Sequence, residues 1–268
     1  MNRIDGPLID CHAHVWEEDM PFVASAWSRP DYAYPVEAYL RDLDAHGIAY
    51  GVIAAASLFG TYNDYTIRAL RGHKRLRGTA IVDPAIDPYT LAAMRADGIV
   101  GIRLQWFFVD PLPDMDGDDF RRLCRRLRDL DMHLHLNIEG ARLIPVARRL
   151  AETGVKLVID HFGWHDFAPR LAAASYREML RLMECGTVWV KMSSGFRRPD
   201  PDLPKAYAQD LLARFGPERL LWGSDAPFVG HEDLADFALA VDLLTHCVPD
   251  EAMRRAIGTA GYHFYFGG

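Results

Sequence analysis

One unit repeats along most of this chain: a short β-branched or apolar run, a polar turn, and then a stretch with helical spacing of about ten to fifteen residues. The first apolar run covers 8–15, and seven more follow at 50–55, 77–82, 99–104, 132–137, 155–160, 187–191 and 220–223. Helical stretches are predicted between them, at 36–46, 62–73, 88–97, 117–130, 142–153, 175–185 and 204–215. Strands that are joined through helices run parallel, and eight such units favour a closed TIM (β/α)8 barrel over an open doubly wound sheet.

The length of 268 residues fits such a barrel as one unit, so we expect a single domain over residues 1–268. The segment 15–34 follows the first strand and is rich in aromatic residues and proline. A connection of that length without its own secondary structure is unusual in a compact domain, and we interpret it as a lid or binding loop. After the eighth strand, 232–262 is predicted to form two more helices, the second starting at Pro249.

Composition and charge narrow the classes of partner. The formal net charge is −7 and the arginines are spread along helices, so no basic footprint for nucleic acid is present. No run of about 18 to 20 apolar residues predicts a membrane span, and residues 1–7 lack a signal-type apolar region. The four cysteines are isolated and are interpreted as small buried residues. We therefore expect a cytoplasmic protein that acts on a small molecule; its oligomeric state is left open.

Polar residues gather where the predicted strands end, and the active sites of such barrels lie at the C-terminal strand ends. The first strand ends in His12 and His14, which point the same way because side chains alternate along a strand, whereas Cys11 and Ala13 point the other way. Two imidazoles are therefore expected to converge. The other predicted strands carry or lead into further polar residues, which include Ser57, Arg103, Asn137, Glu139, Asp160, His161, Lys191, Ser193, Ser194, Arg197 and Asp225.

Three histidines and one aspartate that face one cavity have two chemical uses, and the residues alone leave both open. They can hold Zn²⁺ or a similar ion with an open position for water. Without a metal, the aspartate can act as general base on a water while the histidines polarise the carbonyl under attack. Arg103 and Arg197 suit an anionic group of the substrate. Structural explanations also exist: Asp160 or Asp225 could cap a helix, and His135 could be a core residue.

Four motifs together resemble one family. They are Ile-Asp-x-His-x-His at 9–14, Gly-Ile-Arg at 101–103, Val-Ile-Asp-His-Phe-Gly at 158–163 and Leu-Trp-Gly-Ser-Asp-Ala-Pro at 221–227. In this order they are similar to the amidohydrolase superfamily, in its amidohydrolase-2 branch, and within it to lactonases of pyrone, muconolactone and sugar-lactone substrates. The resemblance implies a distorted barrel and lactone hydrolysis. It implies that Asp225 activates water and that His12, His14 and His161 polarise the lactone carbonyl or, with Asp225, hold a metal.

The departures from the family pattern limit the metal and the substrate. Members with two metals use a carbamylated lysine on strand four, where this chain has Arg103, and many have a ligand histidine at the end of strand five, where this chain has Asn137. The resemblance thus implies one divalent metal, such as zinc, or none. Ser57, Arg103, Arg197 and Asn137 are the expected substrate-binding residues. Val109 and Trp164 stand where arginines for a second carboxylate are expected, which favours a sugar-derived lactone or one with a single acidic group.

Two other functions are weighed beside lactone hydrolysis. Related barrels with the same first motif decarboxylate aromatic acids, so a metal-dependent decarboxylase or another amidohydrolase-type hydrolase is the alternative; chelation and carbon dioxide release would distinguish it. The third is a small-molecule-binding barrel without turnover, since a barrel alone does not prove catalysis.

Overall fold

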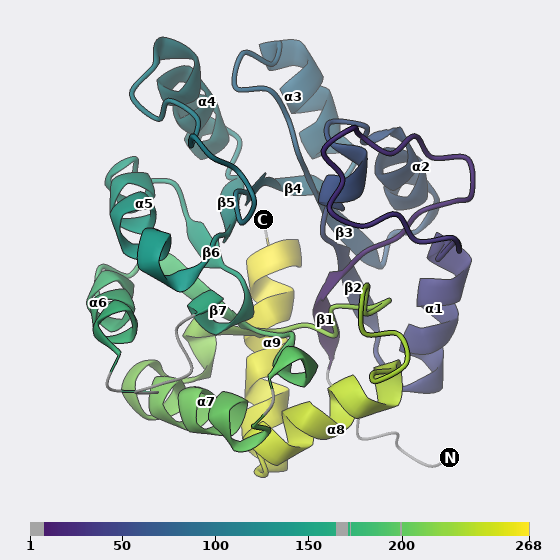
Figure 1. Ribbon diagram of the computed structural model, residues 1–268, viewed down its shortest axis with the longest axis vertical. Coiled ribbons are helices and arrows are strands. Elements are labelled where there is room, and N and C mark those ends of the chain that lie inside the picture. Colours follow the sequence, from purple (N-terminus) through teal and green to yellow (C-terminus); the bar gives the residue numbers. More distant parts are fainter. Residues whose placement is uncertain (1–7, 165–170, 172, 199, 268) are drawn as a thin grey trace.

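The computed structural model describes residues 8–164, 171, 173–198 and 200–267. Eight strands form one parallel sheet in chain order, from β1 to β8, and the helices form a ring around them (Figure 1). The strands are β1 (Ile9–Ala13), β2 (Tyr50–Ile53), β3 (Leu76–Ala80), β4 (Ile99–Gln105), β5 (His133–Asn137), β6 (Leu157–Ile159), β7 (Val188–Met192) and β8 (Leu220–Trp222). The predicted TIM barrel is confirmed.

The barrel closes where β1 meets the segment after β8. The backbone N–H of His14 donates to the carbonyl of Ala226 at 2.8 Å, and that of Asp225 donates to the carbonyl of His12 at 2.8 Å. A parallel bridge joins Ala13 and Ala226. The closing contacts therefore involve the two segments that carry the His-x-His motif and the predicted catalytic aspartate.

The helices between the strands agree with the predicted positions to within a few residues. They are α1 (Val36–Ala45), α2 (Asp64–Gly72), α3 (Pro88–Ala96), α4 (Asp118–Asp129), α5 (Gly140–Glu152), α6 (Ala174–Met183) and α7 (Asp202–Phe215). Two more follow the barrel, α8 (Phe237–Cys247) and α9 (Glu251–Phe266). The expected start at Pro249 is wrong: Asp250 is the N-cap, since its carboxylate accepts from the N–H of Ala252.

Helix α9 lies at the centre of the ring and covers the N-terminal end of the barrel (Figure 1). Tyr265 packs into an inner cluster of strand residues, which are Ile9, Cys11, Val52, Val100, Val158 and Leu221. The helix approaches closely because Gly261 has no side chain; a Cβ there would lie 2.9 Å from the Cys11 sulfur. Because α9 fills the N-terminal end of the barrel, a site can form at the C-terminal ends of the strands.

The side chains of β1 do not alternate strictly between the two faces of the strand. Asp10 pairs with Gly51 and Ala13 pairs with Ile53, so β1 holds one extra residue between these two pairs. Cys11 consequently belongs to the inner cluster, and the expectation that it points away from the His12 side is wrong. The convergence of His12 and His14 holds.

The segment 15–34 is tied down at both ends. Trp16 and Tyr34 form an antiparallel bridge, and the Trp16 indole N–H donates to the carbonyl of Tyr32 at 2.6 Å. Its middle is held where the N–H of Val23 donates to the carbonyl of Leu58 at 2.9 Å. A role as a lid stays a prediction. Among the described helices, none has the length and apolarity that crossing a membrane requires.

Candidate active site

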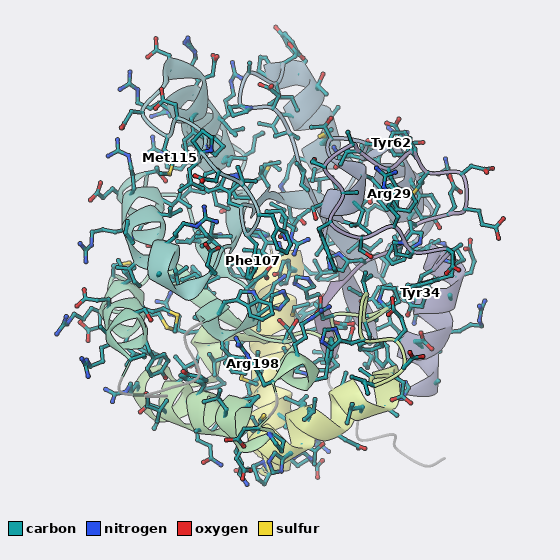
Figure 2. All side chains as sticks on the ribbon, in the orientation of Figure 1. Arg29, Tyr34, Tyr62, Phe107, Met115 and Arg198 are labelled. Atoms are coloured by element: carbon teal, nitrogen blue, oxygen red, sulfur yellow. The ribbon has the colours of Figure 1, made fainter. Side chains whose placement is uncertain are left out.

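A cavity of about 170 Å³ lies at the C-terminal ends of the strands. All of the predicted site residues except His12 line it, and aromatic side chains form much of its wall. Phe107, one of these aromatic residues, lies over the middle of the barrel (Figure 2). The polar lining consists of His14, Ser57, Arg103, Gln105, Asn137, His161, Arg197 and Asp225.

His12, His14 and Asp225 form a compact triangle on the floor of this cavity. His12 Nε2 lies 3.3 Å from His14 Nε2, and each of these nitrogens lies 3.5 Å from Asp225 Oδ1. Ligand atoms about 2.0–2.1 Å from a zinc ion, at tetrahedral angles, stand about 3.3–3.4 Å apart. The triangle therefore has the size of one face of a tetrahedral zinc site, and its chemistry of two imidazoles and one carboxylate fits such an ion.

The surroundings of His14 fix which ring nitrogen is available. Its Nδ1 lies 2.7 Å from the carbonyl oxygen of Ala54, which can only accept, so Nδ1 carries the proton. In the neutral ring Nε2 then has a free lone pair, and it is this atom that faces His12 and Asp225. Such a backbone contact is the usual way in which a ligand histidine is oriented.

Asp225 is held in one orientation by its other oxygen. Oδ2 accepts from the Ser194 hydroxyl at 2.5 Å and from Arg197 Nε at 3.2 Å, which leaves Oδ1 for the two histidines. The backbone is left-handed at Asp225, with φ of 65°, a conformation that aspartate tolerates better than most residues. Burial raises the pKa of Asp225, but its charged and hydrogen-bonding neighbours, the Arg197 guanidinium among them, hold that pKa well below its usual range. The carboxylate is thus ionised at neutral pH.

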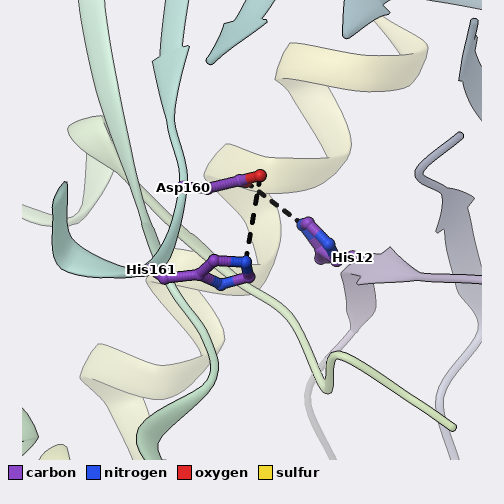
Figure 3. Close-up of side chains that lie close together, drawn as sticks. All are labelled: His12, Asp160 and His161. Carbon is purple, nitrogen blue, oxygen red and sulfur yellow. Dashed lines mark ion pairs between the residues drawn. The ribbon is translucent and has the colours of Figure 1, made fainter. Parts of the chain in front are cut away.

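His161 does not complete the triangle. Its Nδ1 lies 2.8 Å from the Ser193 hydroxyl, and its Nε2 lies 3.9 Å from Asp160. Figure 3 shows His161 and His12 on either side of the Asp160 carboxylate. Burial lowers the pKa of His161 to about 4, so the ring is neutral at pH 7. The predicted set of four thus divides into two overlapping groups that share His12.

Asp160 is the centre of the second group. Its Oδ1 lies 3.2 Å from His12 Nδ1 and also contacts His135, while its Oδ2 lies 3.2 Å from the Arg103 guanidinium. Because Nδ1 of His12 faces this buried anion, Nε2 is directed at Asp225. The structural alternative for Asp160 as a helix cap is wrong, since its carboxylate is surrounded by side chains of four other strands.

Lys191 is completely buried beside this carboxylate. Its Nζ lies 3.0 Å from His12 Nδ1, 3.1 Å from His135 Nε2 and 3.8 Å from Asp160. Burial lowers the pKa of Lys191 to about 8. Two cationic side chains, Lys191 and Arg103, therefore accompany Asp160, so a metal cation is better accommodated by the triangle at Asp225 than by this group.

The four expected substrate-binding residues all reach the cavity. Arg103 donates to the carbonyl of Ala55 at 2.7 Å, and Arg197 donates to that of Val229 at 3.1 Å. Asn137 accepts from the Trp164 indole at 2.8 Å, and Ser57 begins a short 3-10 helix at the rim. Arg103 pairs with Asp160 and Arg197 with Asp225, and each guanidinium keeps further N–H groups for a ligand.

The sequence pattern places Asp160, Lys191, Ser193 and Ser194 at the strand ends but assigns them no role in the site, and it assigns none to His135. A signal was present, because His135 and Asn137 lie two residues apart on one strand and therefore share a face. Lys191 and Ser193 have the same spacing. The left-handed backbone at His161 and Ser194 could not be predicted, because neither position is a glycine.

A closed parallel barrel with two imidazoles and a carboxylate at its C-terminal strand ends is the arrangement of a barrel hydrolase. The chain belongs to the amidohydrolase family, whose model matches residues 9–259.

Three relatives illustrate the likeness. A 4-sulfomuconolactone hydrolase of Rhizobium radiobacter is 27% identical over 261 residues, which cover 92% of this chain and 86% of the relative. A protein of Acinetobacter baumannii, described as a probable 2-pyrone-4,6-dicarboxylic acid hydrolase with citric acid bound, is 28% identical with a TM-score of 0.92, over 98% of this chain and 100% of that one. A Pseudomonas putida protein, a candidate for the same activity, is 33% identical with a TM-score of 0.87, over 96% and 98%.

Proposed function

We propose that this protein hydrolyses a lactone with water activated by Asp225. The observation that carries the proposal is the position of Asp225 Oδ1, 3.5 Å from the Nε2 atoms of both His12 and His14 at the floor of the cavity. An ionised carboxylate in that place accepts a proton from a water molecule that the imidazoles help to orient. The lactone-hydrolase names of the relatives support this reaction.

The groups at the site account for every proton that moves in the proposed reaction. Water gives a proton to Asp225 while its oxygen attacks the lactone carbonyl carbon, and the ring C–O bond then breaks. The proton held by Asp225 passes to the alkoxide that leaves, and the product is a hydroxy acid. His161 is neutral; if its Nδ1 accepts from Ser193, its Nε2–H is the donor that polarises the carbonyl.

The triangle of His12, His14 and Asp225 would hold the single divalent metal, and zinc fits it by donor type and spacing. A bound zinc ion would polarise the carbonyl and lower the pKa of a bound water. Ser194 and Arg197 orient Asp225 with or without the ion, and the Ala54 carbonyl orients His14.

Arg103 and Arg197 are the proposed binding groups for an acidic substituent of the substrate, with Ser57 and Asn137 as neutral hydrogen-bonding groups. The guanidinium groups suit one carboxylate. Trp164 lies beside the cavity, which is consistent with a substrate that has one acidic group rather than two.

The experiment is a panel of lactones followed with a pH indicator, with products identified by mass spectrometry. The proposal predicts that the product gains the mass of one water molecule and that its formation exceeds spontaneous opening by several orders of magnitude. A product that has lost carbon dioxide would show a decarboxylase instead. The matched control is the Asp233→Asn protein, which loses an exposed carboxylate away from the cavity and is expected to act like the native protein.

A further inference from the structure

A second cavity of about 350 Å³ adjoins the active-site cavity and is twice its size. The two share a wall formed by Trp27, Ser57, Arg103, Gln105 and Phe108. Beyond that wall the lining is mainly apolar, and Val23, Ile81, Val82, Val109, Phe120 and Leu123 belong to it. We call this second cavity the side chamber.

The shared wall contains polar atoms that are left without partners. Arg103 Nε and Gln105 Oε1 are buried, and neither has a hydrogen-bond partner among the described residues. Arg103 and Gln105 are two residues apart on β4, so their side chains point to the same side of the strand. Buried polar atoms without partners are uncommon in folded proteins, and a bound ligand is one way to satisfy them. The boundary between the two cavities is therefore a place where a ligand with a polar group would bind.

Aromatic side chains cover the boundary from the outside. Trp27, in the segment 15–34, and Phe108, after β4, are 45% and 65% exposed, and their ring centroids lie 6.0 Å apart. Both line both cavities. Large aromatic side chains that remain so exposed beside a pocket favour an apolar ligand group against them.

We propose that the side chamber binds a hydrocarbon substituent of the substrate, so that the substrate is a lactone that carries an alkyl or aryl chain. The inference rests on the proposed function and narrows its substrate class. The ring and its polar substituents lie between the triangle of His12, His14 and Asp225 and the shared wall, and the chain extends from there into the side chamber. A small polar sugar lactone would leave this apolar space unused.

The expected size of the effect follows from the burial of apolar surface. Each methylene group moved from water into an apolar space strengthens binding about three- to fourfold. If that binding is kept in the transition state, kcat/KM rises by the same factor for each carbon until the chamber is full.

The first test measures kcat/KM for γ-lactones whose side chains grow from methyl to octyl. We expect a rise of at least 50-fold between the ends of the series, because several methylene groups each contribute a factor of about three. The ratio between long- and short-chain lactones is the readout, since it cancels any general loss of activity in a variant. A flat or falling series would overturn the inference while leaving lactone hydrolysis intact.

Two substitutions of a half-buried chamber residue form a matched pair. Val82→Phe fills the side chamber and is expected to reduce the ratio at least tenfold, whereas Val82→Ala enlarges it and is expected to keep or raise the ratio. Val109→Phe, from a different loop, repeats the filling test if the first variant does not fold. Equal ratios in native and folded filled variants would contradict the proposal.

Binding without turnover separates this inference from the proposed function. Calorimetric titration with butanoate, hexanoate and octanoate measures how the affinity for a carboxylate changes as its hydrocarbon chain grows. Affinity that rises about tenfold for every two carbons supports a hydrocarbon-binding side chamber, even if no lactone is hydrolysed. In that case only the proposed function is overturned. Affinity that is independent of chain length overturns the inference.

Discussion

Asp225 contacts His12 twice: its backbone N–H donates to the His12 carbonyl at 2.8 Å, and its Oδ1 lies 3.5 Å from His12 Nε2. The first contact closes the barrel between its first and last strands, and the second forms the floor of the candidate active site. The geometry of the site is consequently coupled to barrel closure. Substitutions that disturb the closure are expected to affect activity even when they touch no ligand.

Gly223 tests this coupling. A Cβ at this position would lie 2.5 Å from the His12 Cβ and 2.8 Å from the His12 backbone nitrogen, so Gly223→Ala must displace β1 or β8. We expect a loss of stability of about 1–3 kcal/mol, measured by urea unfolding, together with at least a tenfold fall in kcat/KM. Gly72→Ala is the control, since a Cβ there meets nothing within 4 Å. Native activity in a folded Gly223→Ala protein would argue against the coupling.

Arg197 is predicted to discriminate between charged and neutral substrates. Its guanidinium lines the cavity and also contacts Asp225, so Arg197→Met should lower kcat/KM for lactones with a carboxylate by about 10- to 100-fold more than for neutral lactones. The comparison between the two substrates removes the effect on Asp225 itself. Arg214→Met, on the exposed face of α7, is the control. Equal losses for both kinds of lactone would show that Arg197 does not bind the acidic group.

The triangle predicts one metal site per chain, with His14 as a ligand. Titration of metal-free protein with zinc in a calorimeter should give a stoichiometry of one, and His14→Gln should weaken zinc binding by at least tenfold, because one of three protein ligands is lost. His263→Gln, on the exposed side of α9, should leave the affinity unchanged. Unchanged zinc affinity in His14→Gln would remove the triangle as the site, and a stoichiometry of two would contradict a single-metal centre.

His161 is expected to make stability depend on pH. Burial lowers its folded pKa to about 4, below the usual value of 6.5, so between these values the unfolded chain binds a proton that the folded protein does not. Stability is therefore retained above pH 6.5 and decreases as the pH falls toward 4. His161→Gln should reduce the loss of unfolding free energy between pH 7 and pH 5 by about 2 kcal/mol in metal-free protein.

The measurement is urea unfolding at both pH values for the native, His161→Gln and His263→Gln proteins. The exposed His263 side chain controls for the removal of one titratable group. If native protein and His161→Gln lose the same free energy between pH 7 and pH 5, the low pKa of His161 is refuted.

The fold could be predicted because short apolar runs and stretches with helical spacing alternate along nearly the whole chain. His12, His14 and Asp225 could be expected to lie together, since strand ends of a parallel barrel meet at one rim. The contacts around Asp160 could not be predicted. The residues that make them come from inside the strands, and only the depth of their side chains in the barrel brings Lys191 close to His12. The extra residue in β1 changes which side Cys11 faces. His161 turns toward Asp160 and Ser193, which sequence spacing does not reveal.

The Asp225 carboxylate is the proposed base that activates water for lactone opening. The most direct measurement is kcat/KM of the native and Asp225→Asn proteins on the best lactone of the panel, with the fold of both checked by circular dichroism. Asparagine keeps the size of the side chain but cannot accept the proton, so we expect kcat/KM to fall by about 100-fold or more. Equal rates for the two folded proteins would contradict it.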